Sequence, residues 1–461
     1  MIRRAFHLRV VFLDTLASTM TQTDLTPEQI VMLCICDYAS QVRGKGFPLT
    51  ELPIRQRQGM GLAPTNLMIN ALGQTPATPW GALGELLMMP DAGTKLEIPG
   101  DDHHPDAYLL LADLVQLDGT PWPNCPRHLL RRAIAALRDE FGLQVKAAFE
   151  HEFHFSGVDE RVGDAYLAES VDSAGNFPAT LLATMRHNGI SPESFLPEFG
   201  PRQFEVTQAA ALGMTAADQA VQVRELVRRL ARRAGGRASF APLIAPGEVG
   251  NGVHVHFSLV DINGEPISYD PANQHGISSR AGAFLAGVLR DIPDFVALTA
   301  ASGISYDRLQ PDRWSATYNN LGRLDREASV RLCEAPTIKD VDPTTATNFE
   351  YRAADVSGNP YLVLGALVWS GVQGLRDELS APIVTTESPE QMSAARRQEL
   401  GLVHLPGSLS EALDRLAGSA RLREWLGSEF IDSYDMTKRG ELGLLAELDE
   451  AERVARYVAG Y

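Results

Sequence analysis

The chain is poor in cysteine, in positive charge and in long apolar runs. Its four cysteines suit neither a disulfide framework nor a zinc set, so we expect buried or spectator thiols. A formal net charge of −17 argues against nucleic acid and anionic membranes as partners, because neither polyanion is attracted to it. Uninterrupted apolar runs stay well below the roughly 18 residues that span a bilayer. With 461 residues, of which 44% are hydrophobic, the chain can bury the core of a large soluble enzyme.

The amino-terminal residues imitate a secretion signal only faintly. Arg9 and Asp14 interrupt the apolar centre, and no small-residue cleavage site follows it. We therefore expect a cytoplasmic protein. Residues 1–20 are expected to be either a disordered extension or the result of a translation start assigned too far upstream.

Turn residues divide the rest of the chain into two domains. Residues 21–120 are expected to form a small β-rich domain, because Glu28–Pro48 alternates as a strand and hairpin do. The stretch Asp118–Pro126 has the composition of a linker, and a helix over Arg127–Phe141 follows it. The larger domain then occupies residues 121–461.

Three further helices are predicted in the larger domain. Thr215 with Asp218 three residues later is typical of a helix start, and the six arginines between 224 and 237 are expected to form a solvated helix face. Near the end of the chain, Leu409–Leu416 and Glu441–Tyr457 have helical periodicity.

Four segments place acidic or imidazole side chains on one face of a predicted β-strand and apolar side chains on the other. The segments are Val145–Phe155, Arg202–Val206, Gly252–Phe257 and Asn348–Arg352. Because side chains alternate along a strand, Glu150 and Glu152 share one face, as do His254 and His256. Glu205 and Glu350 likewise oppose apolar neighbours.

The shared pattern predicts a metal site. Acids gathered on the inner face of a sheet repel one another and lose solvation unless cations neutralise them. Oxygen ligands with a single imidazole suit Mg²⁺ or Mn²⁺ better than Zn²⁺. One acidic strand alone is also typical of a solvated sheet face, but four with bulky apolar reverse faces favour the metal. Four arginines in one stretch add groups suited to a polyphosphate and a carboxylate, and these are Arg308, Arg326, Arg331 and Arg352.

These segments and their order resemble the glutamine synthetase family from about Gln29 to the carboxyl terminus. The stretches that carry the resemblance are Arg43–Phe47, Met89–Ala92, Phe149–Phe153, Glu198–Glu205, Asn251–His256, Ser305–Leu309, Asp325–Arg331 and Glu350–Tyr361. The resemblance implies an α+β fold, with a β-grasp-like amino-terminal domain and a catalytic domain whose curved antiparallel sheet forms a half-barrel. It also implies a homododecamer or another double-ring homo-oligomer, with sites completed at subunit interfaces.

The resemblance further implies two or three Mg²⁺ or Mn²⁺ ions per site, with ATP and glutamate as substrates. The implied metal ligands fall into one set of Glu152, Glu198 and Glu205 and another of Glu150, His254 and Glu350. The implied glutamate ligands are Gly250, Arg308 and Arg352, and the implied catalytic residues are Arg308, Arg326 and Arg352. The implied nucleotide ligands are Glu193, His256, Ser258, Arg326, Arg331 and Lys339.

The chain departs from the family where ammonium binds. The family's Asp-Gly-Ser-Ser loop is matched by Gly59–Asn70, which contains no acid. The family also has a Glu six residues after the clamp arginine, and six residues after Arg308 stands Trp314. An ammonium pocket without these carboxylates binds a cation poorly, since a buried charge without a partner costs several kcal/mol.

We therefore expect an ATP-dependent ligase that joins the γ-carboxylate of glutamate to a hydrophobic or aromatic amine. The expected amine pocket consists of Leu62, Leu67, Met68, Asp91, Asp312 and Trp314, and either aspartate is a candidate base. The alternatives are an ordinary glutamine synthetase that uses ammonia, and a non-catalytic relative. Retention of all six metal ligands argues against the second alternative.

Overall fold

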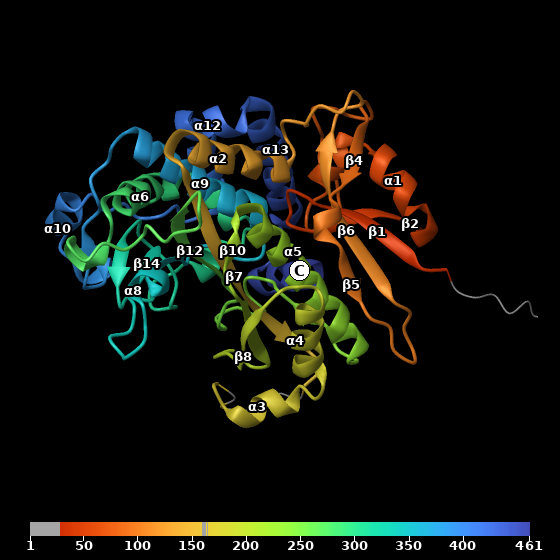
Figure 1. Ribbon diagram of the computed structural model, residues 1–461, viewed down its shortest axis with the longest axis horizontal. Coiled ribbons are helices and arrows are strands. Elements are labelled where there is room, and N and C mark those ends of the chain that lie inside the picture. Colours follow the sequence, from red (N-terminus) through yellow and green to blue (C-terminus); the bar gives the residue numbers. More distant parts are fainter. Residues whose placement is uncertain (1–27, 159–162, 164) are drawn as a thin grey trace, which may run out of the picture.

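The smaller of two sheets lies in the amino-terminal part of the chain (Figure 1). The structure is a computed structural model that describes residues 28–158, 163 and 165–461. The predicted extension at residues 1–20 lies outside the described residues. The strands of the smaller sheet are β1 (Ile30–Cys36), β2 (Val42–Pro48), β3 (Met60–Leu62), β4 (Leu86–Pro90), β5 (Leu96–Ile98) and β6 (Ala107–Val115). β1 and β2 form the predicted hairpin, and helix α1 (Leu52–Gln58) follows it.

The larger sheet has ten strands and positions the polar segments. Its main path runs β16-β13-β14-β15-β12-β7-β9-β8, so strands distant in sequence are hydrogen-bonded neighbours. The strands are β7 (Leu143–Phe155), β8 (Pro192–Pro197), β9 (Gln203–Gln208), β10 (Ala211–Leu212), β11 (Ala238–Ser239), β12 (Val253–Asp261), β13 (Leu321–Arg323), β14 (Val330–Cys333), β15 (Asn348–Tyr351) and β16 (Val384–Thr385). The predicted α+β class with a curved, largely antiparallel sheet is confirmed.

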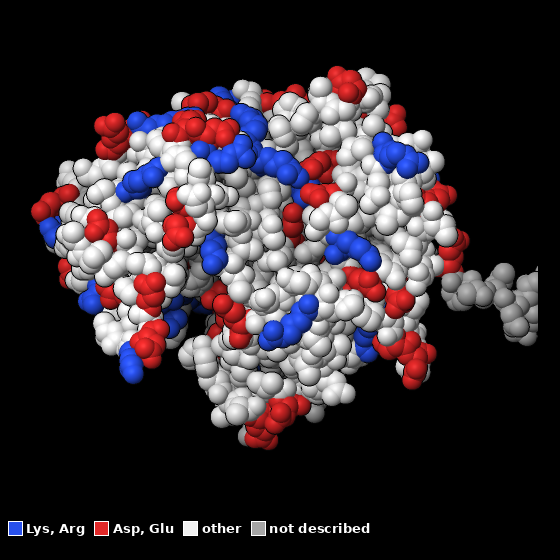
Figure 2. Space-filling model, in the orientation of Figure 1, with Lys and Arg blue, Asp and Glu red and all other residues white. Residues whose placement is uncertain are grey.

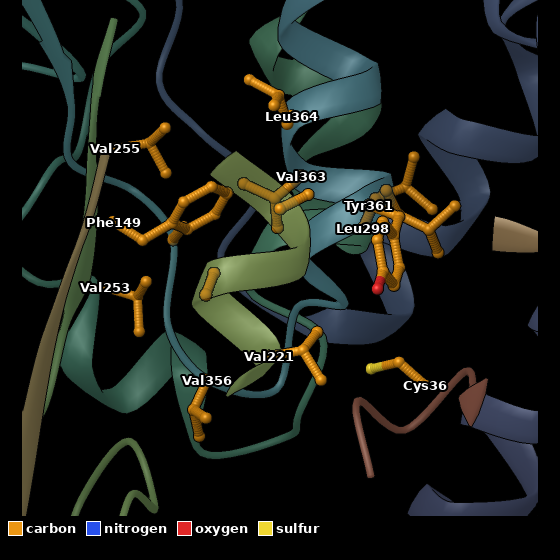
Figure 3. Close-up of a cluster of buried hydrophobic side chains, with 14 of the residues drawn as sticks. Cys36, Phe149, Val221, Val253, Val255, Leu298, Val356, Tyr361, Val363 and Leu364 are labelled. Carbon is orange, nitrogen blue, oxygen red and sulfur yellow. The ribbon is translucent and has the colours of Figure 1, made fainter. Parts of the chain in front are cut away.

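Helices cover the apolar face of the larger sheet. The helices of the central part are α2 (Pro126–Phe141), α3 (Ala168–Ser173), α4 (Phe177–His187), α5 (Gly213–Arg233), α6 (Ser279–Thr299), α7 (Ser305–Arg308), α8 (Pro343–Ala346) and α9 (Pro360–Arg376). Figure 3 shows Phe149, Val253 and Val255 of the sheet directed toward α5 and Val363 of α9. Because these apolar side chains take one face of β7 and β12, the alternating Glu150, Glu152, His254 and His256 must take the other.

The predicted helix over Arg127–Phe141 is confirmed as α2. Pro126 is its first residue, and Gly142 ends it with a φ of 62°. Glycine adopts this left-handed conformation without the steric cost that a Cβ brings.

The carboxyl-terminal region is helical, as predicted from its periodicity. Its helices are α10 (Ala394–Glu399), α11 (Leu409–Gly418), α12 (Ala420–Leu426), α13 (Ser428–Leu445) and α14 (Glu450–Gly460). The expectation of one helix over Glu441–Tyr457 is wrong, because α13 and α14 are separate. Asp449 accepts from the backbone N–H of Glu452 and so begins a new helix with a capping box.

Two predictions about α5 are also wrong. The helix begins at Gly213, and Asp218 does not serve the helix start but accepts hydrogen bonds from Arg127 and Tyr361 in the interior. Arg224 is not solvated: it is buried and donates to the Ser40 hydroxyl at 2.7 Å. Tertiary partners therefore override two patterns that are typical of a helix surface.

Among the described residues, every helix is too short or too polar to cross a bilayer. Figure 2 shows Lys and Arg side chains interspersed with Asp and Glu over the visible face. This mixed distribution gives that face no continuous basic surface for a polyanion.

Arg127 connects the smaller sheet to α5. Its side chain is only 2% exposed, and its guanidinium nitrogens lie 3.0 Å from Asp91, 2.8 Å from Asp113 and 2.9 Å from Asp218. One buried cation therefore neutralises carboxylates from both parts of the chain.

Arg127→Met should lower the free energy of unfolding by about 3 to 5 kcal/mol, because it leaves carboxylates without their buried partner. Urea denaturation measures this loss. As a control, Arg138→Ala should change stability by less than about 0.5 kcal/mol, since Arg138 contacts Asp139 on the exposed surface. Equal stability of the Arg127→Met and parent proteins would contradict the assignment.

Candidate active site

Strand register brings the four polar segments to one place. Glu150 lies opposite His254, and Glu152 lies opposite Glu205. Glu350 lies opposite both His256 and Arg331 on its two flanking strands. Directly opposed residues of an antiparallel pair project from the same face of the sheet.

Two groups of these side chains place possible ligand atoms within 4.8 Å of one another. The first group is Glu150, His254 and Glu350, and the second is Glu152, Glu205 and His254. Glu198 belongs to neither group, although it lines the same cavity. Its carboxylate accepts a hydrogen bond from the Tyr166 hydroxyl at 3.2 Å.

The pKa shifts differ strongly among the carboxylates that line the cavity. Burial and the charge of Glu152 raise the pKa of Glu198 to about 7, and burial with four nearby carboxylates raises the pKa of Glu205 to about 9. Burial alone would also raise the pKa of Glu350, but His254 and Arg352 outweigh it and lower that pKa to about 2. The Glu205 end of the site thus has an excess of carboxylate that the protein does not neutralise.

The donor set fits a divalent cation of the Mg²⁺ or Mn²⁺ kind. Both groups consist of carboxylates and one imidazole, and a cation beside Glu205 would favour the ionised form that its surroundings now disfavour. Hydrogen bonds from neighbouring groups already orient the proposed ligand side chains. Glu152, for example, accepts from the Gly252 backbone N–H at 2.8 Å and from Gln203 at 3.2 Å.

Arginine side chains form the wall that adjoins these acids. Arg352 is buried, contacts Glu350, and donates to the backbone carbonyls of Arg326 at 2.7 Å and Trp314 at 3.2 Å. Arg308 is buried too, and its Nη2 donates to the carbonyls of Ala353 and Ala354. These backbone contacts fix each guanidinium beside the acids.

These walls enclose a cavity of about 900 Å³. The acids of the two groups form its acidic wall, and Arg308, Arg326, Arg331 and Arg352 form its arginine wall. The two walls adjoin, because Arg331 and Arg352 both contact Glu350. Gly250 also lines it, and a Cβ there would lie 2.6 Å from Arg308, so only glycine leaves this approach open. The volume is in the range of sites that enclose a small-molecule substrate.

Several predicted site residues lie elsewhere. His256 lies 3.1 Å from Glu150 but is not in the cavity wall. Three further predicted nucleotide ligands are also absent from the cavity wall. These three are Glu193, Ser258 and Lys339, of which Glu193 and Lys339 are exposed.

The predicted contribution of Leu62, Leu67 and Met68 to an amine pocket is not compatible with their burial. Leu67 and Met68 are 0% exposed within the core, so they offer no surface to a ligand or to another chain. Asp91 forms salt bridges with Arg127 and Arg131 and lies outside the cavity wall. Asp312 and Trp314, in contrast, line the cavity. An apolar, turn-rich segment does not reveal from sequence which of its side chains point inward.

The cavity also contains aromatic residues that the sequence did not indicate. Tyr166 and Phe199 line it beside Trp314. Both lie in irregular segments, where no periodicity marks a functional face. Phe199 stands directly after Glu198, which was the one available signal.

Comparisons with known proteins agree with this geometry. The family model "Glutamine synthetase, catalytic domain" matches residues 123–457, and the model of the amino-terminal domain matches residues 16–122. A gamma-glutamylpolyamine synthetase of Streptomyces coelicolor is 31% identical over 95% of this chain and 96% of its own length. The type-1 glutamine synthetase 1 of Dictyostelium discoideum is 25% identical, covering 93% of this chain and 89% of its own.

Solved structures give the same result. A crystal structure described as a novel glutamine synthase homolog is 37% identical and covers 95% of this chain and 99% of its own, with a TM-score of 0.88. Members of this family are ATP-dependent ligases that use Mg²⁺ or Mn²⁺. The chain belongs to the glutamine synthetase family.

Proposed function

We propose that this protein is a γ-glutamylamide synthetase, which joins the γ-carboxylate of glutamate to a hydrophobic or aromatic amine at the expense of ATP. The observation that carries this proposal is Trp314 in the cavity wall, where an acid would be needed to bind ammonium. The similarity to the gamma-glutamylpolyamine synthetase of Streptomyces coelicolor supports an organic acceptor, because a polyamine is an organic amine.

The reaction requires activation of glutamate. A free carboxylate is a poor acyl donor because its leaving group would be oxide. In the proposed sequence, a γ-carboxylate oxygen attacks the terminal phosphorus of ATP, ADP leaves, and γ-glutamyl phosphate forms. The amine nitrogen then attacks the acyl carbon, phosphate leaves, and the nitrogen loses a proton.

The arginine wall is proposed to bind the anionic parts of the substrates. Arg308, beside Gly250, would hold the α-carboxylate of glutamate, and Arg352 would contact both glutamate and the transferred phosphoryl group. Arg326 and Arg331 would bind phosphate. The remaining proposed nucleotide ligands lie outside the wall of this cavity, and they are Glu193, His256, Ser258 and Lys339.

Two cation positions are proposed on the acidic wall. Glu152, Glu198 and Glu205 would hold one ion, and Glu150, His254 and Glu350 would hold the other. Bound divalent cations would offset the negative charge of the phosphate oxygens. Following the family, we place the reaction in the cytoplasm and in a double-ring homo-oligomer.

A panel of acceptors tests the proposal. We expect kcat/KM for benzylamine or another apolar amine to exceed that for ammonia at least about 10-fold, since Trp314 offers aromatic surface where the family has a Glu. ADP release measured with ammonia, benzylamine, aniline and spermidine gives the comparison, and mass spectrometry identifies each amide. Faster formation of glutamine than of any organic amide would instead make the protein an ordinary glutamine synthetase.

A further inference from the structure

Three aromatic side chains form a continuous row along the cavity. The ring of Phe199 lies 5.3 Å from that of Tyr166 and 5.2 Å from that of Trp314. Tyr166, Phe199 and Trp314 are 58%, 51% and 55% exposed, although all three line the cavity. Aromatic surface that is contiguous and open within a cavity is typical of a binding surface rather than of a core.

The loop that carries Trp314 has an unusual backbone. Asp312 and Trp314 both have positive φ values, of 58° and 54°. Non-glycine residues adopt this conformation at an energetic cost, so surrounding contacts must maintain it.

Three contacts hold Trp314 in this conformation. The Glu327 carboxylate accepts its backbone N–H at 3.1 Å, and Arg352 donates to its carbonyl at 3.2 Å. The guanidinium of Arg326 lies over the indole ring, 5.8 Å from its centroid. Arg326 and Arg352 line the cavity, whereas Glu327 is not in the cavity wall.

We propose that Tyr166, Phe199 and Trp314 form an aromatic clasp for the organic group of the amine, and that Glu327 is the positioning residue that sets the clasp. This inference rests on the proposed function and assigns its acceptor specificity to particular residues. The ligand class is a primary amine with a flat or bulky apolar substituent.

The position of the clasp determines what part of the substrate it contacts. The Tyr166 hydroxyl donates to Glu198, so the aromatic row begins at the acidic wall and extends along the cavity to the Trp314 loop. An apolar substituent gains ring contacts there that ammonia cannot make. Glu327 acts indirectly, because it contacts the Trp314 backbone and not the cavity.

Phe199→Ala tests the clasp, since an exposed side chain can be removed without opening the core. We expect KM for benzylamine to rise about 10-fold, while KM for ATP and for glutamate stays within about twofold. Leu324→Ala is the matched control, because Leu324 is 78% exposed and is not in the cavity wall. Unchanged KM for benzylamine in Phe199→Ala would overturn the clasp.

Glu327 is tested with two variants. Glu327→Ala removes the acceptor for the Trp314 N–H and should raise KM for benzylamine about 5- to 10-fold with a smaller change in kcat. Glu327→Gln keeps an oxygen at this position and should restore KM to within about threefold of the parent value. A general loss of kcat with all KM values unchanged would contradict a positioning role. If the parent enzyme forms no organic amide, the proposed function itself fails, whereas normal amide formation with unaffected variants refutes only the clasp.

Discussion

Glu205→Gln is expected to lower the rate of ATP turnover at least about 100-fold and to leave the fold intact. Glu205 is buried, and its carboxylate lies within 4.8 Å of possible ligand atoms of Glu152 and His254. Four other carboxylates near it raise its pKa. Glutamine keeps the shape of the side chain and removes the negative charge that a divalent cation requires. ADP release at saturating glutamate and amine measures the effect, and circular dichroism checks the fold.

Two measurements separate a loss of metal binding from an unspecific effect of the Glu→Gln substitution. Mn²⁺ should raise the melting temperature of the parent protein and raise that of the variant less, because a ligand stabilises the state that binds it. Glu140→Gln is the control, since Glu140 contacts Arg376 on the surface, away from the cavity. Glu205→Gln activity within threefold of the parent would refute the assignment of Glu205 to a metal site.

Trp314→Glu is expected to shift acceptor preference toward small cationic amines. The substitution removes an apolar wall and places a carboxylate beside the acceptor end of the cavity, where an ammonium ion gains a partner. We expect the ratio of kcat/KM for ammonia to kcat/KM for benzylamine to rise at least about 100-fold. Competition of the two acceptors in one reaction, with both amides quantified, gives this ratio directly.

Trp314→Phe provides the comparison for this experiment, because it keeps an aromatic ring at a left-handed position that already accommodates a bulky side chain. Its acceptor ratio should stay within about threefold of the parent. An unchanged ratio in Trp314→Glu would show that residue 314 does not determine the acceptor.

Much of the local structure could be predicted from short-range signals. Pro126 and Gly142 mark the two ends of α2 because each residue type has a backbone preference that is independent of distant contacts. The alternation in Val145–Phe155 likewise separates Glu150 and Glu152 from the phenylalanines in any strand. The chemical character of the site could therefore be predicted before its geometry was known.

Local signals failed where a side chain has a distant partner. Thr215 and Asp218 have the spacing of a helix start, but Asp218 instead pairs with Arg127, which lies 91 positions earlier. Leu67 and Met68 end a short 3-10 helix over Pro64–Met68. A helix this short does not show a periodicity, so sequence alone did not tell whether they face a ligand or the core.

The sequence by itself determined the polar faces of the four segments predicted as strands and the types of ligand that those faces offer, because side-chain alternation is a property of the backbone. Only the tertiary structure decided that Glu205 lies opposite Glu152, that Phe199 lies between Tyr166 and Trp314, and that Glu327 holds the Trp314 loop. Those contacts depend on strand register and on how loops pack on the larger sheet, and both are set by the free energy of burying the whole core.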